Sequence, residues 1–252
     1  MKRLFVGLLT AAFVMVGLMA GTSGAKAETV RIGTEGAYPP FNFIDESGEL
    51  KGFDVEIAMA LCDKMGVTCE LVAQDWDGII PGLLAKKYDA IVASMSITDE
   101  RKKSVNFTNK YYSNLVRFVA PKGSGLDTGN LAGKSIGAQR ATVAASWLED
   151  NLGDSASIKL YDTQENANLD LSSGRLDAIF ADGLVIHEWL TTDEGAGFEF
   201  VGEGYSLDDG IGIAVRKEDT ALLDKLNAAI HAIIEDGTYH KINMNYFPFS
   251  IY

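Results

Sequence analysis

The stretch Asp89-Ala90-Ile91-Val92-Ala93-Ser94-Met95-Ser96-Ile97-Thr98-Asp99-Glu100-Arg101 combines several structural signals in about a dozen residues. It opens on a short apolar run, which is typical of a buried strand. Two hydroxyl residues follow, Ser94 and Ser96, and Thr98 then has the features of a helix N-cap with acids in the first turn. Ligands bind at the carboxyl ends of strands in open α/β sheets, and a guanidinium and free helix N–H groups suit a carboxylate. The stretch therefore predicts a ligand site that includes Arg101.

A second stretch repeats part of this pattern. Residues 171–182, Leu-Ser-Ser-Gly-Arg-Leu-Asp-Ala-Ile-Phe-Ala-Asp, align without gaps on residues 83–94, Leu-Leu-Ala-Lys-Lys-Tyr-Asp-Ala-Ile-Val-Ala-Ser. Both contain a basic turn, the tripeptide Asp-Ala-Ile and a strand that ends on a polar residue, so Asp182 corresponds to Ser94. So short a match can arise by chance. We interpret it as two similar α/β lobes that each present a polar strand end to one shared cleft.

Strand and helix patterns alternate along the rest of the chain. The clearest helix spans Thr220 to Asp236, with an apolar face at helical spacing and Gly237 as its stop. The alternation predicts α/β lobes with mostly parallel sheets. The sequence contains no glycine-rich phosphate loop, no nucleophile elbow and no Ser-His-Asp or Cys-His set.

The first 27 residues have the pattern of a secretory signal peptide. Lys2 and Arg3 precede an apolar run from Leu4 to Ala20, and Ala25-Lys26-Ala27 is a small-x-small cleavage site. An uncleaved membrane anchor is the alternative, which the cleavage site disfavours. We expect a mature chain that begins near Glu28 and is exported to the periplasm.

The mature chain is strongly acidic. Removing the three basic residues of the leader from the 22 of the full sequence leaves 19 against 35 acidic residues, a formal net charge of −16. This charge argues against nucleic acid or an anionic membrane surface as partner and is compatible with a cationic small molecule. About 225 residues suffice for one large domain or two lobes of about 100 each.

Cys62 and Cys69 are the only cysteines of the sequence. In an exported protein an even pair indicates a disulfide. Metal binding is the alternative, but His187, His231 and His240 lie far away in sequence. We therefore predict no metal site.

Two predicted loops at strand ends carry candidate binding residues. The loop after the strand Thr29 to Gly33 contains Glu35 and Tyr38, and the loop after the strand Val67 to Val72 contains Trp76. Each residue also has an ordinary interpretation, as a solvated acid or as a packed aromatic side chain. The residues alone leave the choice open.

Several motifs together resemble the solute-binding proteins of polar amino-acid ABC importers, in particular the lysine/arginine/ornithine- and histidine-binding type and its opine-binding relatives. The resemblance covers essentially the whole mature chain. It rests on Gly33-Thr34-Glu35 to Phe41, Gly52-Phe53-Asp54, Ala90 to Arg101, Gly174-Arg175-Leu176-Asp177-Ala178, and Arg216-Lys217-Glu218-Asp219 with Asp236-Gly237-Thr238-Tyr239.

The resemblance implies a type II periplasmic-binding-protein fold. In this fold two Rossmann-like lobes are joined by a two-stranded hinge, with the ligand cleft between them. We expect residues 28–115 and 212–252 to form lobe 1 and residues 116–211 to form lobe 2, after a signal peptide of residues 1–27.

The resemblance also implies individual roles. Arg101 corresponds to the family arginine that grips the α-carboxylate, and Asp182 corresponds to the acid that holds the α-ammonium. Cys62 and Cys69 match the family's local disulfide. The other expected ligand contacts are Ser96 and Thr142 beside the carboxylate, Ser94 beside Asp182, Glu35 where binders of cationic side chains carry an acid, and Tyr38 and Trp76 around the side chain.

The sequence departs from the family pattern at the side-chain end of the expected pocket. Relatives often have Ser-Ser-x-Ser where this chain has Ala93-Ser94-Met95-Ser96, and Gly-Thr-Thr where it has Ala141-Thr142-Val143. Gln139 stands where some relatives have an apolar residue, and we include Met95 and Gln139 among the predicted ligand-binding residues. These departures leave the exact ligand open. Asp182 favours a free α-amino acid over an opine, because opine binders tend to lack an acid there.

We therefore expect the substrate-binding component of an amino-acid ABC transporter. It would bind arginine, lysine or ornithine by lobe closure and deliver it to membrane permease subunits as a monomer without a cofactor. The alternatives are an opine, a neutral polar amino acid such as histidine or glutamine, a dehydratase-type enzyme on the same fold, and a sensor domain. Every charged group of the expected cleft already has a binding role, so we predict no enzymatic activity.

Overall fold

The computed structural model describes Met1 and residues 28–252, so the predicted signal peptide, residues 2–27, lies outside the described residues. Three sheets are present, and their strands have the following bounds. The first contains β1 (Thr29–Thr34), β5 (Thr68–Ala73), β6 (Ala90–Ile91), β7 (Val105–Phe107) and β13 (Ala214–Arg216). The second contains β8 (Val116–Pro121), β9 (Ser135–Gln139), β10 (Ser157–Tyr161), β11 (Ala178–Asp182) and β12 (Phe198–Tyr205). A small third sheet contains β2 (Ala37–Tyr38), β3 (Asn42–Ile44) and β4 (Leu50–Lys51).

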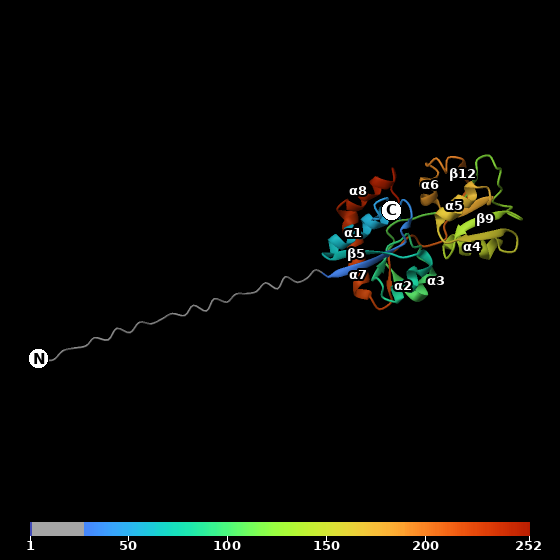
Figure 1. Cartoon of the computed structure of the whole chain (residues 1–252). Coiled ribbons are helices and arrows are strands. Elements are labelled where there is room, and N and C mark those ends of the chain that lie inside the picture. The colour runs from blue at the N-terminus through green and yellow to red at the C-terminus, as the bar shows by residue number, and fades with distance from the viewer. Residues whose placement is uncertain (2–27) are drawn as a thin grey trace.

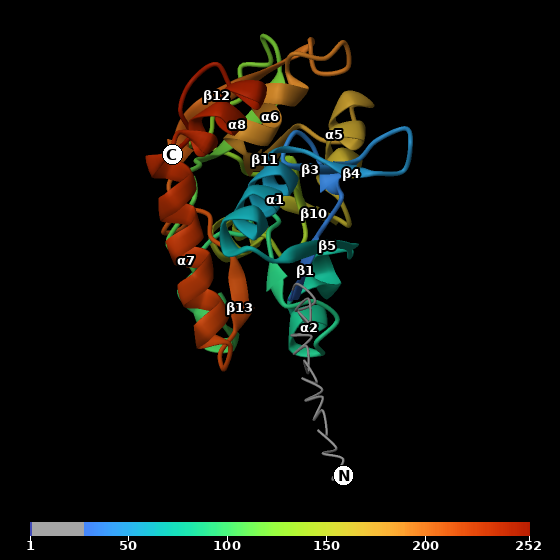
Figure 2. The same cartoon turned by 90° about the vertical axis from the view of Figure 1, so that its left-hand side faces the viewer.

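The helices fall into two groups. Around the first sheet lie α1 (Phe53–Met65), the 3-10 turn η1 (Trp76–Gly78), α2 (Ile79–Leu84), α3 (Asp99–Ser104), α7 (Thr220–Glu235) and α8 (Thr238–Tyr246). Around the second lie α4 (Val143–Leu152), α5 (Gln164–Ser172) and α6 (Gly183–Trp189). Figure 1 shows the two groups side by side as separate bodies, which we call the first and the second lobe, and Figure 2 views the molecule with the first lobe in front. The predicted two-lobe α/β architecture is confirmed, and the boundaries at 115/116 and 211/212 stay predictions.

Both large sheets are mixed, so the prediction of mostly parallel sheets was wrong. In the first sheet, β1 pairs in parallel with β5 and β6, whereas β13 runs antiparallel to β6 and β7. In the second sheet, β9 pairs in parallel with β10 and β11, whereas β8 runs antiparallel to β11 and β12. β8 and β13 each follow a segment that comes from the other lobe. Their direction is therefore set by that crossing and not by a local strand-helix-strand connection.

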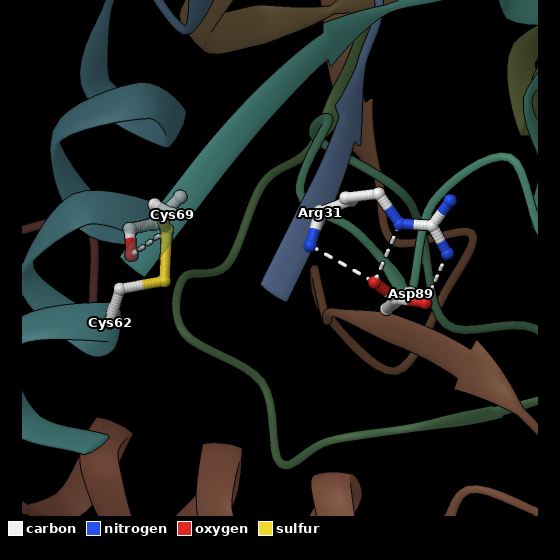
Figure 3. The surroundings of a disulfide bond; sticks show 5 residues. Arg31, Cys62, Cys69 and Asp89 are labelled. Atoms are coloured by element: carbon white, nitrogen blue, oxygen red, sulfur yellow. Dashed lines mark hydrogen bonds and ion pairs between the residues drawn. A yellow bond between two sulfur atoms is a disulfide. The ribbon is translucent and has the colours of Figure 1, made fainter. Parts of the chain in front are cut away.

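The repeat seen in the sequence has a structural counterpart. Asp89 precedes β6 and Asp177 precedes β11, and each carboxylate accepts a hydrogen bond from a backbone N–H of the neighbouring strand. The donor is Arg31 at 3.0 Å in the first lobe and Ser135 at 2.8 Å in the second. Figure 3 shows that Arg31 also pairs with Asp89 through its side chain. In each lobe, the same hydrogen bond from a backbone N–H to an aspartate thus aligns a strand that leads to the cleft.

Each lobe has a core of its own. In the second lobe, Phe118 of β8 stacks on Phe180 of β11 with ring centroids 4.2 Å apart, and Leu148 of α4 packs against them. In the first lobe, the predicted apolar face of α7 contributes Leu226 and Ile230 to a cluster with α1 and β1. The cores hold the strand ends in place, and the loops beyond these ends supply the site described below.

Cys62 of α1 and Cys69 of β5 form the predicted disulfide within the first lobe (Figure 3). Among residues 28–252, no group of histidine, cysteine and acidic side chains suits a metal ion. None of the helices in this part of the chain is long and apolar enough to cross a membrane.

Candidate ligand-binding site

A small cavity lies between the two lobes. Its walls come from the carboxyl ends of β1, β6, β9 and β11, together with β2, η1 and the first turns of α3 and α4. Every predicted ligand-binding residue except Met95 lines this cavity: Glu35, Tyr38, Trp76, Ser94, Ser96, Arg101, Gln139, Thr142 and Asp182, joined by Ala93 and Val143.

Met95 lies elsewhere. Its side chain is fully buried in an apolar cluster of the first lobe with Ile79 and Val105. Its neighbours Ser94 and Ser96 face the cavity. The sequence pattern identified the segment correctly but assigned one side chain to the wrong side of it.

Arg101 reaches the cavity from the first turn of α3. Thr98 is the N-cap of this helix, as predicted, and its hydroxyl accepts a hydrogen bond from the backbone N–H of Arg101 at 3.2 Å. The guanidinium donates to the carbonyl oxygens of Ser96 at 2.9 Å and Ala141 at 3.0 Å, and its Cζ lies 5.3 Å from the ring centroid of Trp76. These contacts fix the guanidinium and leave further N–H groups for a ligand carboxylate. Burial lowers the pKa of Arg101 to about 10, so the side chain is charged at neutral pH.

Two carboxylates of the cavity are tied across the lobes. Glu35 accepts a hydrogen bond from Nε2 of Gln139 at 2.6 Å, and Asp182 accepts one from the hydroxyl of Tyr38 at 2.8 Å. Burial raises the pKa of Glu35 to about 7 and the pKa of Asp182 to about 6, although these hydrogen bonds oppose the shift. A cation bound nearby would favour the ionised form of both groups.

The two carboxylates of the cavity have different charged neighbours. Asp182 is the acid that acts most strongly on the pKa of Arg101, which burial lowers and Asp182 raises. Glu35 is influenced instead by Asp75, which adds to the effect of burial in raising its pKa. Burial raises the pKa of Tyr38 well above its usual value, and the charges of Asp182 and Glu35 raise it further. Glu35 also borders a groove around Asp75 and Arg140, whereas Arg101 borders a separate groove with Thr98 and Ala141, so the two side chains lie on different sides of the cavity.

Thr142 is the N-cap of α4, as predicted. Its hydroxyl donates to the carbonyl of Gln139 at 2.7 Å and accepts from the backbone N–H of Ala145 at 3.1 Å. The N-terminus of α4 therefore borders the cavity with Thr142 and Val143 on its wall. Helix N-termini favour negatively charged groups.

The backbone of Ala141 is a part of the site that sequence reasoning missed. Its carbonyl accepts hydrogen bonds from Arg101 and, at 3.2 Å, from Nε1 of Trp76, so one loop of the second lobe engages both first-lobe side chains. Ala141 has a left-handed backbone with φ 57°. The departure from Gly-Thr-Thr at Ala141 was the only signal of this in the sequence.

Ala141→Gly should therefore raise the free energy of unfolding. A left-handed backbone costs a residue with a Cβ atom about 1–2 kcal/mol, and the extra freedom of glycine in the unfolded chain offsets part of the gain. We expect a net stabilisation of about 0.5–1 kcal/mol, measured by urea unfolding. Ala144→Gly, in the ordinary helical backbone of α4, is the control and should destabilise by about 1 kcal/mol. An equal decrease in the free energy of unfolding in both variants would contradict the prediction.

Arg140 forms a second contact between the lobes that the sequence did not reveal. Its guanidinium lies 3.2 Å from the carboxylate of Asp77 in η1 and also pairs with Asp162 of the second lobe. These side chains are exposed, so the ion pairs contribute little to stability. They lie beyond the Glu35 end of the cavity, in a groove that shares Glu35 and Trp76 with it.

Two α/β lobes that enclose a small polar cavity, lined by a fixed guanidinium and two carboxylates, are the features of a protein that surrounds and holds a small charged solute. Comparison with known proteins agrees with this class. The chain belongs to the bacterial extracellular solute-binding proteins, family 3, whose sequence model matches residues 30–249.

Relatives of known name can be compared over most of the chain. The chain is 45% identical over 236 residues to the L-arginine-binding protein of Pseudomonas aeruginosa, and the alignment covers 90% of this chain and 91% of the relative. It is 39% identical to the ABC transporter arginine-binding protein 1 of Escherichia coli, over 98% of this chain and 100% of the relative. The solved structure of an ancestral arginine-binding protein bound to arginine superposes with a TM-score of 0.82 at 38% identity, over 88% of this chain and 100% of that one. These findings confirm the predicted family and fold, and the relatives are binding proteins and not enzymes.

Proposed function

We propose that this protein is the binding component of an ABC importer and that its ligand is a basic L-amino acid, with L-arginine as the preferred one. The charges of the cavity carry this proposal. With Arg101, Asp182 and Glu35 ionised, one positive and two negative groups line the cavity and leave it a net charge of −1. Arginine has one carboxylate and two cationic groups, so it carries the complementary charge of +1. Unpaired charges are very costly to bury, so this match favours a basic amino acid over a neutral one.

The positions of the charges also match the length of the ligand. Arg101, with Ser96 and the start of α4, would bind the α-carboxylate, and Asp182 at the same end would bind the α-ammonium. Glu35 at the other end would bind the side-chain cation. Bonds of this kind, to a charged partner, contribute about 1.5–3 kcal/mol each.

The aromatic residues suit the middle of such a ligand. Tyr38 and Trp76 both line the cavity, and Nε1 of Trp76 is held by the second lobe. An aliphatic stem with a terminal cation gains both apolar contact and about 0.5–2 kcal/mol of cation–π attraction against such rings. The names of the two arginine-binding relatives support the same assignment.

The cellular setting of the protein is part of the proposal. The leader pattern and the extracellular family favour a periplasmic protein that closes on its ligand and delivers it to membrane permease subunits. We propose that it works as a monomer. Cross-lobe contacts such as those of Tyr38 and Gln139 require both lobes to meet, so they form only in the closed state.

Ligand screening tests the proposal. The mature chain, unfolded and refolded to remove bound solute, is heated with each common amino acid, with citrulline and with octopine, because binding to the native state raises the melting temperature. We expect the largest increase with arginine and smaller ones with lysine and ornithine. A shift only with octopine or only with neutral amino acids would overturn the basic-ligand assignment.

A further inference from the structure

The motif Gly52-Phe53-Asp54 was singled out in the sequence, yet none of its residues lines the cavity. Gly52 has φ 119°, and a Cβ atom there would lie 2.3 Å from the carbonyl oxygen of Phe41, so only glycine fits. This tight approach brings the first turn of α1 under the loop after β6. Asp54 is consequently placed in the interior with no exposed surface.

Asp54 is a buried carboxylate whose described partners are all neutral. It accepts hydrogen bonds from Nδ2 of Asn42 at 2.9 Å, from the hydroxyl of Tyr111 at 2.6 Å and from the hydroxyl of Ser94 at 2.9 Å. The orientation of the Asn42 amide is fixed independently, because its Oδ1 accepts from the backbone N–H of Gly36 at 2.9 Å. Burial raises the pKa of Asp54, and its three donors oppose that shift.

Ser94 connects this buried charge to the cavity. Ser94 is 5% exposed and has a left-handed backbone with φ 51°. It lines the cavity wall while its hydroxyl bonds to Asp54. A hydroxyl has one hydrogen to donate and two lone pairs that accept. Since an ionised carboxylate can only accept, the hydrogen of Ser94 is committed to Asp54. The oxygen therefore offers only lone pairs to whatever occupies the cavity.

We propose that Asp54 is a positioning residue that makes Ser94 an obligate hydrogen-bond acceptor for the α-ammonium group of the ligand. The inference rests on the proposed function, since it concerns the amino-acid ligand of the same cavity. Asp54 acts through Ser94 and does not touch the ligand. When ionised, Asp54 also places a negative charge 2.9 Å from the serine oxygen, where it favours a cationic donor over a neutral group.

Ser94 and Asp182 line the same cavity. Tyr112 has a pKa raised well above its usual value, first by burial and then by both Asp54 and Asp182. Asp182 faces the cavity directly and Asp54 acts from the second layer, so an ammonium between Asp182 and Ser94 would meet negative charge and lone pairs on both sides.

Paired ligands test this role. L-Arginine and 5-guanidinopentanoic acid, which lacks the α-amino group, are titrated calorimetrically at pH 8 into the wild type, Asp54→Asn, Ser94→Ala and the double variant. The ratio of the two Kd values measures what the protein gains from the α-ammonium. We expect Asp54→Asn and Ser94→Ala each to reduce this ratio by about tenfold or more, as for loss of one hydrogen bond to a charged group. The double variant should reduce the ratio by less than the product of the two single reductions, because both changes act through one hydroxyl.

Tyr111→Phe is the matched control. It removes another donor from the same buried carboxylate but leaves the hydroxyl of Ser94 in place, so the protein should lose stability while the ratio of Kd values stays within about twofold of the wild type. A purely structural role of Asp54 predicts that Asp54→Asn weakens both ligands equally. An unchanged ratio in Asp54→Asn would therefore overturn the inference.

A second measurement does not depend on the folding of any variant. Neutron diffraction of the deuterated wild type locates the deuterium of the Ser94 hydroxyl, which should point to Asp54; density that points into the cavity would overturn the inference. Failure of the proposed function has a different signature. In that case the wild type binds neither guanidino ligand, whereas the deuterium position on Ser94 can still be determined.

Discussion

Arg101→Ala should weaken arginine binding by at least about 2–3 kcal/mol, a roughly 30- to 150-fold increase in Kd. The guanidinium is held in position by the carbonyl of Ser96 and the face of Trp76 within the first lobe, and by the carbonyl of Ala141 once the lobes close. Its removal would leave the ligand carboxylate buried without a cationic partner, which is the costly case for a buried charge. Isothermal titration of the mature chain measures the effect.

Arg101→Lys separates charge from geometry. Lysine keeps the positive charge but cannot form two parallel bonds to a carboxylate, and it cannot reproduce the planar contact with Trp76. We expect an affinity between those of the wild type and the alanine variant. Wild-type affinity in Arg101→Ala, with unfolding unchanged, would remove Arg101 from the proposed carboxylate site.

Glu35→Gln should reduce the preference for arginine over citrulline by about 10- to 100-fold, because a bond to a charged group contributes about 1.5–3 kcal/mol. Citrulline has nearly the shape of arginine and carries a neutral ureido group in place of the guanidinium. Glu35 and Arg101 border different grooves beside the cavity, so we expect the substitution to alter the side-chain contact and to spare the α-amino-acid end. Calorimetric Kd values for both ligands give the preference, and an equal effect on both would contradict the role of Glu35.

The same glutamate should make arginine binding depend on pH. Burial raises its pKa to about 7 in the absence of ligand, so at pH 6 the side chain is mostly protonated and must lose its proton to pair with a guanidinium. Arginine affinity should therefore rise with pH through about 7 and then level off, with proton release on binding below that pH. In the proposed binding mode Asp182, whose pKa burial raises to about 6, pairs with the α-ammonium that both ligands share, so the arginine-to-citrulline ratio isolates Glu35. This ratio should lose its pH dependence in Glu35→Gln.

The raised pKa of Glu35 also affects the stability of the unliganded protein. Because the folded-state pKa lies above the ordinary value of 4.5, the contribution of Glu35 is fully present below about pH 4.5 and is lost as the pH rises through about 7. Glu35→Gln should flatten the stability profile of the ligand-free protein over this window. An unchanged profile in thermal unfolding would indicate that Glu35 is not buried in the free state.

Local sequence determined much of this protein. The pattern of residues 89–101 located the strand, the Thr98 cap and the arginine of the site, because apolar runs, caps and first-turn acids act over a few residues. The agreement between residues 83–94 and 171–182 correctly indicated two related lobes, since Asp89 and Asp177 each anchor the neighbouring strand by the same backbone hydrogen bond. The disulfide between Cys62 and Cys69 could be predicted for the same reason, because the two cysteines lie close together in the chain.

Only the tertiary structure decided how distant segments meet. The antiparallel placement of β8 and β13 follows from where the chain crosses between lobes, which no local pattern records. The side of the loop that Met95 faces, the carbonyl of Ala141 on Arg101 and the hydrogen bond of Ser94 to Asp54 each join residues that are far apart in sequence or depend on a backbone angle. The pKa values of Glu35 and Asp182 likewise arise from burial between two lobes, and burial is a property of the packed molecule and not of either residue.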